Sequence, residues 1–353
     1  MRSHVTPNMK PSNRRNYALL QFFDHFIGRE KTDNLFGKKR EQNKINMLKS
    51  LIKTGKGTIE PVERIKYKDK EHFYKNYVQT RKPVILDGAA KDWACCKNWS
   101  LEYIKELYGE DEIVLLEDKV ADKEVKKLGD VIDNIREGGS KYYRFYPLFN
   151  RHPERLIDFD IKWLREQRQK FSFGESIQAF IGGKGTITHL HNAFPPNLFV
   201  QVFGEKKWFL YDDYYTPIVD PHPAQNIYRY APYIGEKPFD PFAAKNAKFP
   251  QYKYIHGYEA DLRAGDILWN PPYVWHTVKN VADSIGVGYR WINPFYCFAS
   301  APFYGMLDLM AYNPPIWKSI KFYQKDFNLL QLAETGQLED FLNEQKTQLS
   351  KIS

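Results

Sequence analysis

The stretch from Gly185 to Trp208 constrains the fold most strongly, because it joins two histidines to an alternating apolar run and a lysine pair. Successive side chains of a β-strand point to opposite faces. We therefore expect His189 and His191 to share one face and Thr188 to lie on the other. Two imidazoles on one face of a strand are an arrangement that suits a single metal ion.

A further candidate ligand lies in the segment from Ala264 to Asn280, where His276 follows a predicted strand and a Pro-Pro turn. Trp275 stands directly before this histidine. Such a turn can aim an imidazole into the end of a barrel. Together the two segments predict a β-barrel with a metal ion at its mouth.

These segments resemble the JmjC/cupin-like family of Fe(II)- and 2-oxoglutarate-dependent oxygenases, whose hallmark is His-x-Asp/Glu followed much later by a histidine. The resemblance covers roughly residues 59–294 and includes an entry segment typical of the cupin-like branch, residues 81–109. Without any gap, the positions that recur in the family fall on Gly185, Thr188, Asn197, Gly204 and Lys206. Several separate motifs therefore agree in their order along the chain.

The resemblance implies a role for each matching residue. His191 becomes the first iron ligand and His276 the distal ligand. Lys206 pairs with a carboxylate of 2-oxoglutarate, and Thr188 and Asn197 are its hydrogen-bonding neighbours. The implied cofactors are Fe(II) and 2-oxoglutarate, with O2 as co-substrate.

A predicted strand from Lys141 to Tyr146 corresponds to one that lines the 2-oxoglutarate pocket in this family. Tyr142 and Tyr143 are therefore candidates for the pocket lining. Near the predicted last strand, Arg290, Trp291 and Asn293 are candidates to face the same pocket, although core packing explains Trp291 equally well.

The chain departs from the family at Ala193, which stands where the carboxylate ligand is expected. A methyl group cannot bind iron, so the metal would keep two histidines and one vacant position. A chloride or bromide ion at that position would restore the missing negative charge. The same loss of the carboxylate marks halogenases that use iron and 2-oxoglutarate. The resemblance therefore favours halogenation of an unactivated C–H bond.

Two alternatives stay open. A register shifted by two residues makes His189 and His191 a pair, and with His276 they form a three-imidazole site suited to iron, zinc or copper. This register needs a two-residue insertion before Asn197, and either site could serve a hydroxylase of a small molecule or a protein side chain. In the other alternative catalysis has been lost and the barrel is an inactive binding module, although Lys206 argues against this interpretation.

The fold expected from these signals is mainly β. A 353-residue chain with 42% hydrophobic and 16% aromatic residues can bury a large core, and the aromatic excess favours strands. About eight strands counted from Lys141 fit a double-stranded β-helix, the jelly-roll barrel of cupins, with flanking α-helices at both ends. We predict a helical extension over residues 1–56, the barrel domain over residues 57–298 and a C-terminal helical region over residues 299–353.

The segment from Asp212 to Tyr258 is rich in Pro, Tyr, Asp and Ala and is longer than an ordinary loop. We predict that it packs over the barrel mouth and contributes to substrate choice. Its histidines, His222 and His256, have no ligand spacing to another residue. The predicted substrate is a small molecule, a class that here includes amino acids and peptides.

The whole net charge of +9 lies in the first 56 residues, which hold thirteen Lys and Arg against four Asp and Glu. Apolar residues after Asn13 predict an amphipathic helix, and a second helix is expected from Glu41 to Lys53. Homodimerisation through these helices is a hypothesis. The charge is compatible with an anionic partner, but nucleic acid is not favoured.

Cys95, Cys96 and Cys297 form no disulfide framework and show no metal-ligand spacing, so a reducing compartment is the simpler interpretation. The sequence contains no run of eighteen apolar residues and no secretory signal pattern. No transmembrane segment is expected, and the expected location is cytoplasmic.

Overall fold

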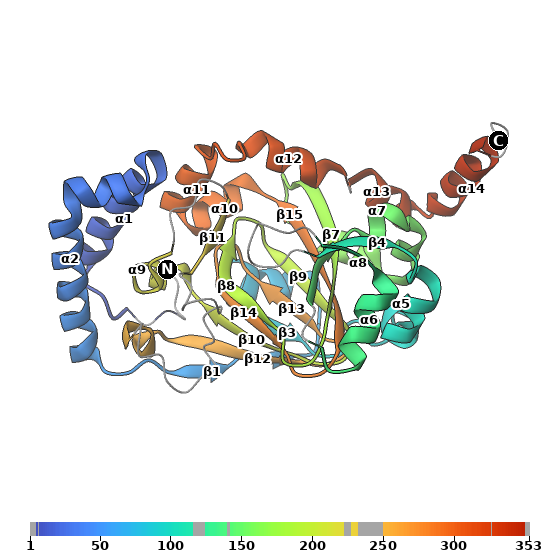
Figure 1. The fold of residues 1–353 in the computed structure, drawn as a ribbon, viewed down its shortest axis with the longest axis horizontal. Helices are drawn as coiled ribbons and strands as arrows, with labels where there is room; N and C mark the ends of the chain where they lie inside the picture. Colours follow the sequence, from blue (N-terminus) through green and yellow to red (C-terminus); the bar gives the residue numbers. More distant parts are fainter. Residues whose placement is uncertain are drawn as a thin grey trace.

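The computed structural model describes residues 5, 7–115, 124–139, 142–221, 227–231, 250–325 and 327–349. Two β-sheets lie face to face at the centre of the molecule (Figure 1). Helices α1 (Pro11–Ile27) and α2 (Arg29–Thr54) stand at one end, and α14 (Leu338–Leu349) lies at the other.

Eight antiparallel strands form the barrel, four in each sheet. They are β7 (Phe173–Gly182), β8 (Ile187–Ala193), β9 (Asn197–Phe203), β10 (Lys206–Tyr211), β12 (Gly257–Leu262), β13 (Ile267–Asn270), β14 (Trp275–Asn280) and β15 (Ser284–Ile292). One sheet has the order β12-β10-β14-β8 and the other the order β13-β9-β15-β7, so strands that follow one another in the chain mostly alternate between sheets. This connectivity confirms the predicted jelly-roll fold.

Short strands extend both sheets beyond these eight. β1 (Ile59–Pro61) pairs with β12, β11 (Tyr228–Tyr230) with β8, β3 (Val84–Leu86) with β13, and β2 (Arg64–Ile65) with β3. β6 (Tyr142–Tyr146) pairs with β7, and β4 (Glu112–Leu115) with β5 (Glu124–Lys127) makes a separate two-stranded sheet. The strand predicted over Lys141 to Tyr146 is therefore present as β6.

Alternation along the strands divides the buried residues into an inner and an outer set. Phe180, Phe199, Trp208, Leu268 and Val278 belong to one buried cluster that joins the inner faces of the two sheets. Their sequence neighbours point outward, where the helices cover them.

The remaining α-helices follow in chain order. They are α3 (Lys70–Phe73), which continues as a π-helix (Tyr74–Val78), α4 (Ala94–Asn98), α5 (Leu101–Tyr108), α6 (Leu128–Arg136), α7 (Leu148–Arg151), α8 (Ile161–Glu166), α9 (Thr216–Val219), α10 (Pro294–Ser300), α11 (Pro302–Leu309), α12 (Ile316–Lys325) and α13 (Phe327–Thr335).

The helical predictions differ from the structure at their ends. The helix predicted over Glu41 to Lys53 begins twelve residues earlier, at Arg29, because Gly37 does not interrupt the helical backbone. In the C-terminal region Gly336 has a φ of 73° and separates α13 from α14. A left-handed glycine is a common end of a helix, and other residues rarely adopt this conformation.

The N-terminal arm, residues 7–54, packs on the outer face of the six-stranded sheet. Met47 and Leu51 of α2 share a buried cluster with Leu190 of β8 and Trp275 of β14. Tyr17 of α1 donates a hydrogen bond to Asp220, at 3.1 Å. The amphipathic helix predicted after Asn13 is present as α1, but only part of its apolar stripe is buried: Tyr17 and Leu20 are buried, whereas Leu19 is 59% and Phe26 44% exposed.

The three cysteines are free thiols, in agreement with the predicted absence of a disulfide framework. Among the described residues, no helix combines the length and the apolar character that crossing a membrane requires.

Candidate functional site

His191 and His276 lie directly opposite each other on neighbouring antiparallel strands, β8 and β14. Their ring centroids are 4.2 Å apart. Trp208 of β10 stacks on His276 at 5.4 Å, with an angle of 19° between the ring planes. Because Trp208 belongs to the inner cluster, the two histidines face the inside of the barrel.

Both histidines are oriented in the same way by the backbone. Nδ1 of His276 lies 2.9 Å from the carbonyl oxygen of Val274, and Nδ1 of His191 lies 2.8 Å from that of His189. A carbonyl accepts hydrogen bonds only, so each Nδ1 carries the proton and the lone pair of each ring is on Nε2. Burial lowers the pKa of His276 to about 4, which keeps the ring neutral. Neutral imidazoles fixed in this manner are suitable metal ligands.

A β-bulge in β8 corrects the expected alternation. Val278 of β14 pairs with Thr188, whereas His276, two residues earlier, pairs with His191, so β8 carries one extra residue here. Thr188 and His191 therefore share the inner face, and the prediction that Thr188 lies on the opposite face is wrong. Strict alternation fails because a bulge sets two residues of one strand against one of its partner.

His189 and Leu190 are the two residues within the bulge. Leu190 joins the outer cluster, and Nε2 of His189 donates a hydrogen bond to the carbonyl oxygen of Ala231 at 2.5 Å. The Tyr230 ring nevertheless stacks against both histidines, 6.2 Å from the His189 ring and 5.8 Å from the His191 ring, so the two side chains remain neighbours. The structure brings His191 and His276 together and directs Nε2 of His189 to the backbone.

Lys206 is an inward-facing cation held by neutral groups. Its side chain is 1% exposed, and Nζ donates hydrogen bonds to Asn280 Oδ1 at 2.5 Å and to Ser284 Oγ at 2.8 Å. Burial lowers the pKa of Lys206 to about 7. Within the described part of the chain, no carboxylate forms an ion pair with it. A buried ammonium without an anion is costly, so this environment suits a carboxylate ligand.

Asn197 and Arg290 occupy one cross-strand pair on the inner face, near His276. Asn197 also pairs with Asn270, whose side-chain nitrogen lies 3.4 Å from Nδ1 of His276. Oδ1 of Asn197 is buried without a hydrogen-bond partner among the described residues. Both Asn197 and Arg290 therefore lie close to the histidine pair, whereas Lys206 lies further along the barrel.

Other candidates have different positions. Trp291 belongs to the core on the outer face of the seven-stranded sheet, and Asn293 caps α10 by accepting a hydrogen bond from the Tyr296 N–H. Tyr143 lies on β6, where its main chain pairs with Ile181. The side chains of Tyr142 and Tyr143 and the whole of His222 lie outside the described residues.

Ala193 ends β8 and pairs with Tyr228 of β11, while His191 pairs with Tyr230. The Tyr230 ring lies 5.8 Å from the His191 ring. β11 belongs to the segment that was predicted to pack over the barrel mouth, and this strand lies beside His191. Other described parts of the segment, which include Tyr214, Ile218 and Tyr252, pack in the outer cluster with α2 instead. Among the described residues, no three His, Cys, Asp or Glu side chains are grouped to hold a metal ion.

Trp208, Asn280 and Ser284 were not singled out from the sequence. Trp208 could have been found, because it stands two residues after Lys206 on the same predicted strand and must share its face. Asn280 and Ser284 carry no comparable signal, because their contact with Lys206 depends on the pairing of β14 with β10.

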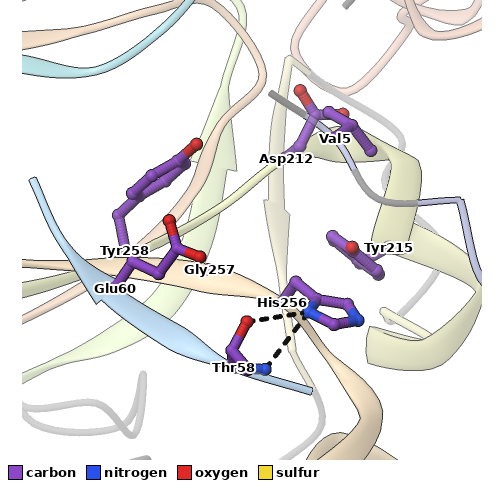
Figure 2. Close-up of a pocket in the computed structure, with 8 residues that line it drawn as sticks. All are labelled: Val5, Thr58, Glu60, Asp212, Tyr215, His256, Gly257 and Tyr258. Atoms are coloured by element: carbon purple, nitrogen blue, oxygen red, sulfur yellow. Dashed lines mark hydrogen bonds between the residues drawn. The ribbon is translucent and has the colours of Figure 1, made fainter. Parts of the chain in front are cut away.

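A small separate pocket lies between β1, β12 and the 3-10 helix Asp213–Tyr215 (Figure 2). Its lining includes Glu60, Asp212 and Tyr258. His256 also lines it, and its Nδ1 accepts a hydrogen bond from the Thr58 N–H at 3.2 Å. His256 thus lies apart from the His191–His276 pair, as its lack of ligand spacing predicted.

The chain has the jelly-roll fold of cupins with a pair of inward histidines, and the comparisons with known proteins agree with this class. Residues 70–296 match the family model described as a cupin-like domain. This match covers more than half of the chain, so the chain belongs to the JmjC/cupin-like family, whose members depend in general on Fe(II) and 2-oxoglutarate.

Several curated proteins are similar to the chain. It is 27% identical over 229 residues to lysine-specific demethylase 8 of Xenopus tropicalis, an alignment that covers 63% of this chain and 50% of that protein. It is 24% identical over 268 residues to the bifunctional peptidase and (3S)-lysyl hydroxylase JMJD7 of Homo sapiens, an alignment that covers 64% of this chain and 81% of that protein. It is 25% identical over 288 residues to tRNA wybutosine-synthesizing protein 5 of Mus musculus, an alignment that covers 71% of this chain and 84% of that protein.

The chain spans 50% of the Xenopus tropicalis demethylase and 58% of its counterpart in Danio rerio. The names of the relatives described above denote a demethylase, a hydroxylase and a tRNA-modification protein, and none of these names denotes a halogenase. They support an enzyme of the oxygenase kind.

Proposed function

We propose that the chain is an Fe(II)- and 2-oxoglutarate-dependent oxygenase that oxidises a C–H bond, with the metal held by His191 and His276. The observation that carries this proposal is the geometry of the pair: the ring centroids are 4.2 Å apart, and both Nδ1 atoms are bonded to backbone carbonyls. Two rings that bond to the backbone through Nδ1 leave Nε2 of each available to an iron ion. The bulge supports this pair over the alternative pairing of His189 with His191.

The residues around the histidines also fit 2-oxoglutarate. Lys206 offers a buried ammonium to one carboxylate, which would replace its neutral partners Asn280 and Ser284. Thr188 shares the inner face and is the proposed hydrogen-bonding neighbour. Asn197 contributes a buried polar side chain nearby. When bound, iron and 2-oxoglutarate supply the oxidising chemistry, while the protein orients the reactants.

Trp208 has a supporting role in this proposal. Its indole stacks on His276 and meets the Phe199 ring edge to face at 4.8 Å. The stacking restrains the His276 ring, and the two large aromatic side chains exclude water from the space between the sheets. Ordered ligands and a dry interior both favour a controlled reaction of the substrate.

Halogenation is a second candidate, and Ala193 is the observation that favours it. The side chain at this position provides no carboxylate, so a chloride or bromide ion could complete the metal site. Hydroxylation needs no such ion and agrees with the hydroxylase among the relatives. The relatives' names refer to lysyl groups and to tRNA, but for this chain we propose a small molecule or a peptide as the substrate.

The proposal is tested by anaerobic titration of the full chain with Fe(II) and 2-oxoglutarate, while the visible charge-transfer band of the complex is recorded. We expect the band in the wild-type chain and its loss in His191→Ala and in His276→Ala. His256→Ala is the matched control and should keep the band, because His256 lies in a different pocket. Failure of the wild-type chain to form the band would overturn the proposal and favour an inactive binding module.

The same titration with added chloride or bromide separates the two reactions. A band that shifts with halide supports halide at the metal site and halogenation. A band that is indifferent to halide supports hydroxylation with two histidines as the protein ligands.

A further inference from the structure

The inner face of the barrel carries an unusual balance of charge. On the eight barrel strands, the inward-facing charged side chains are Lys206 and Arg290, both of them cations. The carboxylates of these strands, Glu175, Glu259 and Asp261, point outward: Glu175 bonds to Arg165 and Arg168, and the other two bond to Lys207. A ligand between the sheets therefore meets positive charge without a protein carboxylate on these strands to balance it.

The position of Arg290 follows from its contacts. Nη1 donates a hydrogen bond to Gln178 Oε1 at 2.7 Å, and the guanidinium lies 5.4 Å above the Phe180 ring. Both partners are on the inner face of β7. Arg290 also pairs across the sheet with Asn197, and Asn197 pairs with Asn270, whose side-chain nitrogen lies 3.4 Å from Nδ1 of His276. Arg290 is therefore held within electrostatic range of the proposed metal site.

Gly288 leaves room for this arrangement. A Cβ atom at Gly288 would lie 3.1 Å from Asn197 Oδ1 and 3.2 Å from Nη2 of Arg290. Both distances are shorter than an ordinary carbon contact, so a larger residue would crowd the two side chains. The buried Oδ1 of Asn197, unpartnered among the described residues, and the guanidinium of Arg290 thus border one small space.

Arg290 and Lys206 differ in access. Lys206 is 1% exposed and is matched to a carboxylate of 2-oxoglutarate in the proposed function, whereas Arg290 is only partly buried. Among the described residues, no carboxylate forms an ion pair with Arg290. A guanidinium presents several N–H donors in a planar fork that fits a carboxylate, so Arg290 is available to a second anionic group.

We infer that Arg290 binds a carboxylate carried by the substrate, and that the site selects an acidic substrate over a lysyl side chain. This inference rests on the proposed function, because it assigns the substrate class of the same site. A lysyl ammonium in the same place would face the Arg290 guanidinium, and like charges repel strongly where water is excluded. Arg290 is then a specificity-determining residue of the reaction.

Three capped amino acids of similar size test this inference: the N-acetyl amides of glutamate, glutamine and lysine. Calorimetry with the full chain loaded with Mn(II), which does not turn over, and 2-oxoglutarate measures their affinities. We expect the glutamate derivative to bind about tenfold more tightly than the glutamine derivative, because a hydrogen bond to a charged acceptor is stronger than one to a neutral acceptor by about that factor in affinity. The lysine derivative should bind most weakly. Arg290→Gln should abolish this order, and Arg290→Lys should retain part of it.

The affinity for 2-oxoglutarate distinguishes the inference from a role for Arg290 in co-substrate binding. Lys206→Gln should weaken 2-oxoglutarate binding and keep the preference among the three probes. Arg290→Gln should leave 2-oxoglutarate binding unchanged and abolish the preference among the probes. The inference is overturned if the wild-type chain prefers the lysine derivative, shows no preference, or binds no probe at millimolar concentration. It is also overturned if Arg290→Gln weakens 2-oxoglutarate binding and leaves the probe preference intact. Failure to bind Mn(II) and 2-oxoglutarate would count against the proposed function, while the probe preference of the unloaded chain still tests Arg290.

Discussion

Lys206 is buried among neutral hydrogen-bond acceptors, and the next residue, Lys207, points outward to Glu259 and Asp261. If Lys206 pairs with 2-oxoglutarate, Lys206→Met should lower the affinity for 2-oxoglutarate about 10- to 100-fold, because a charge-assisted hydrogen bond is lost. Lys207→Met is the matched control and should leave the affinity unchanged. Calorimetry on the metal-loaded chain gives both values, and equal affinities in the two variants would contradict the proposed role.

The pKa of Lys206 also predicts a pH dependence. Burial lowers this pKa to about 7, so above pH 7 the ligand-free chain holds Lys206 mostly neutral, and binding a carboxylate requires proton uptake. The affinity for 2-oxoglutarate should fall by up to about fiftyfold between pH 7 and pH 9 if the bound complex keeps an ordinary lysine pKa. Calorimetry in buffers of different ionisation enthalpy measures the uptake directly, and a pH-independent affinity would refute the prediction.

The lowered pKa of Lys206 also makes the free energy of unfolding depend on pH. Between pH 7 and the ordinary lysine pKa, the unfolded chain binds more protons at this residue than the folded chain does. The contribution of Lys206 to the free energy of unfolding therefore rises with pH in that window. A bound anion opposes the effect by favouring the charged form.

Ala193 sets the ligand composition of the proposed metal site. Ala193→Asp adds the carboxylate that the family pattern has at this position, which should raise the affinity for Fe(II) and remove any response of the charge-transfer band to chloride. Ala193→Gly adds no ligand and should behave like the wild-type chain. Halide titrations of both variants make the comparison, and a stronger halide response in Ala193→Asp would show that the vacancy model is wrong.

At the scale of single elements, β8 shows how one bulge decides a site. The pairing of Thr188 with Val278 and of His191 with His276 puts both residues on the inner face. A regular strand would have separated them, since a shift of one residue reverses the face of each side chain. Because of the bulge, Thr188 and His191 face the same side of the strand although they are three residues apart, and Leu190 packs on the outer side.

The short strand β11 is tied to α11 through a buried ion pair. Arg229 Nη2 donates to Asp308 Oδ1 at 2.6 Å, and Tyr273 donates to the other carboxylate oxygen at 2.8 Å. Arg229→Met should lower the free energy of unfolding by about 3–5 kcal/mol, because Asp308 would be left buried and, among the described residues, bonded through its side chain to Tyr273 alone. Adding Asp308→Leu should recover part of the loss. Urea unfolding of both variants measures this, and an unchanged stability in Arg229→Met would contradict the role of the pair.

At the scale of the whole molecule, the basic N-terminal arm is part of the folded structure. Met47 and Leu51 cover Leu190 and Trp275, on the reverse side of the strands that carry the site histidines. A chain that starts near Gly57 would expose this surface, so its size on gel filtration would report an uncovered apolar patch as well as any homodimer. Dimerisation through the arm stays a hypothesis.

Neighbouring residues of α2 provide a test of the packing. Leu51 is fully buried, whereas Ile52 is 58% exposed. Leu51→Ala should lower the free energy of unfolding by about 2–5 kcal/mol through lost burial and a cavity, and Ile52→Ala should change it by less than about 0.5 kcal/mol. Chemical denaturation of the full chain compares them, and equal effects would mean that the arm does not pack on the barrel as described.

Much of the fold could be predicted because strand patterns and caps are local. The strand predicted from Lys141 to Tyr146 is present as β6, and the amphipathic pattern after Asn13 forms α1. Ser100 caps α5 by accepting a hydrogen bond from the Tyr103 N–H, three residues further along the chain. The start of α2 was placed too late: the helix predicted from Glu41 begins at Arg29 and runs through Gly37. The short strands that extend the sheets carry few residues and therefore little pattern.

The sequence by itself determined the jelly-roll class and singled out the proposed site residues His191, His276 and Lys206, because strand periodicity and motif order are local features of the sequence. Only the tertiary structure decided which faces these residues share. The bulge in β8, the neutral partners of Lys206 and the unbalanced charge of Arg290 all arise from the pairing of strands that are distant in the sequence. Cross-strand register depends on packing throughout the barrel, so no local pattern contains it.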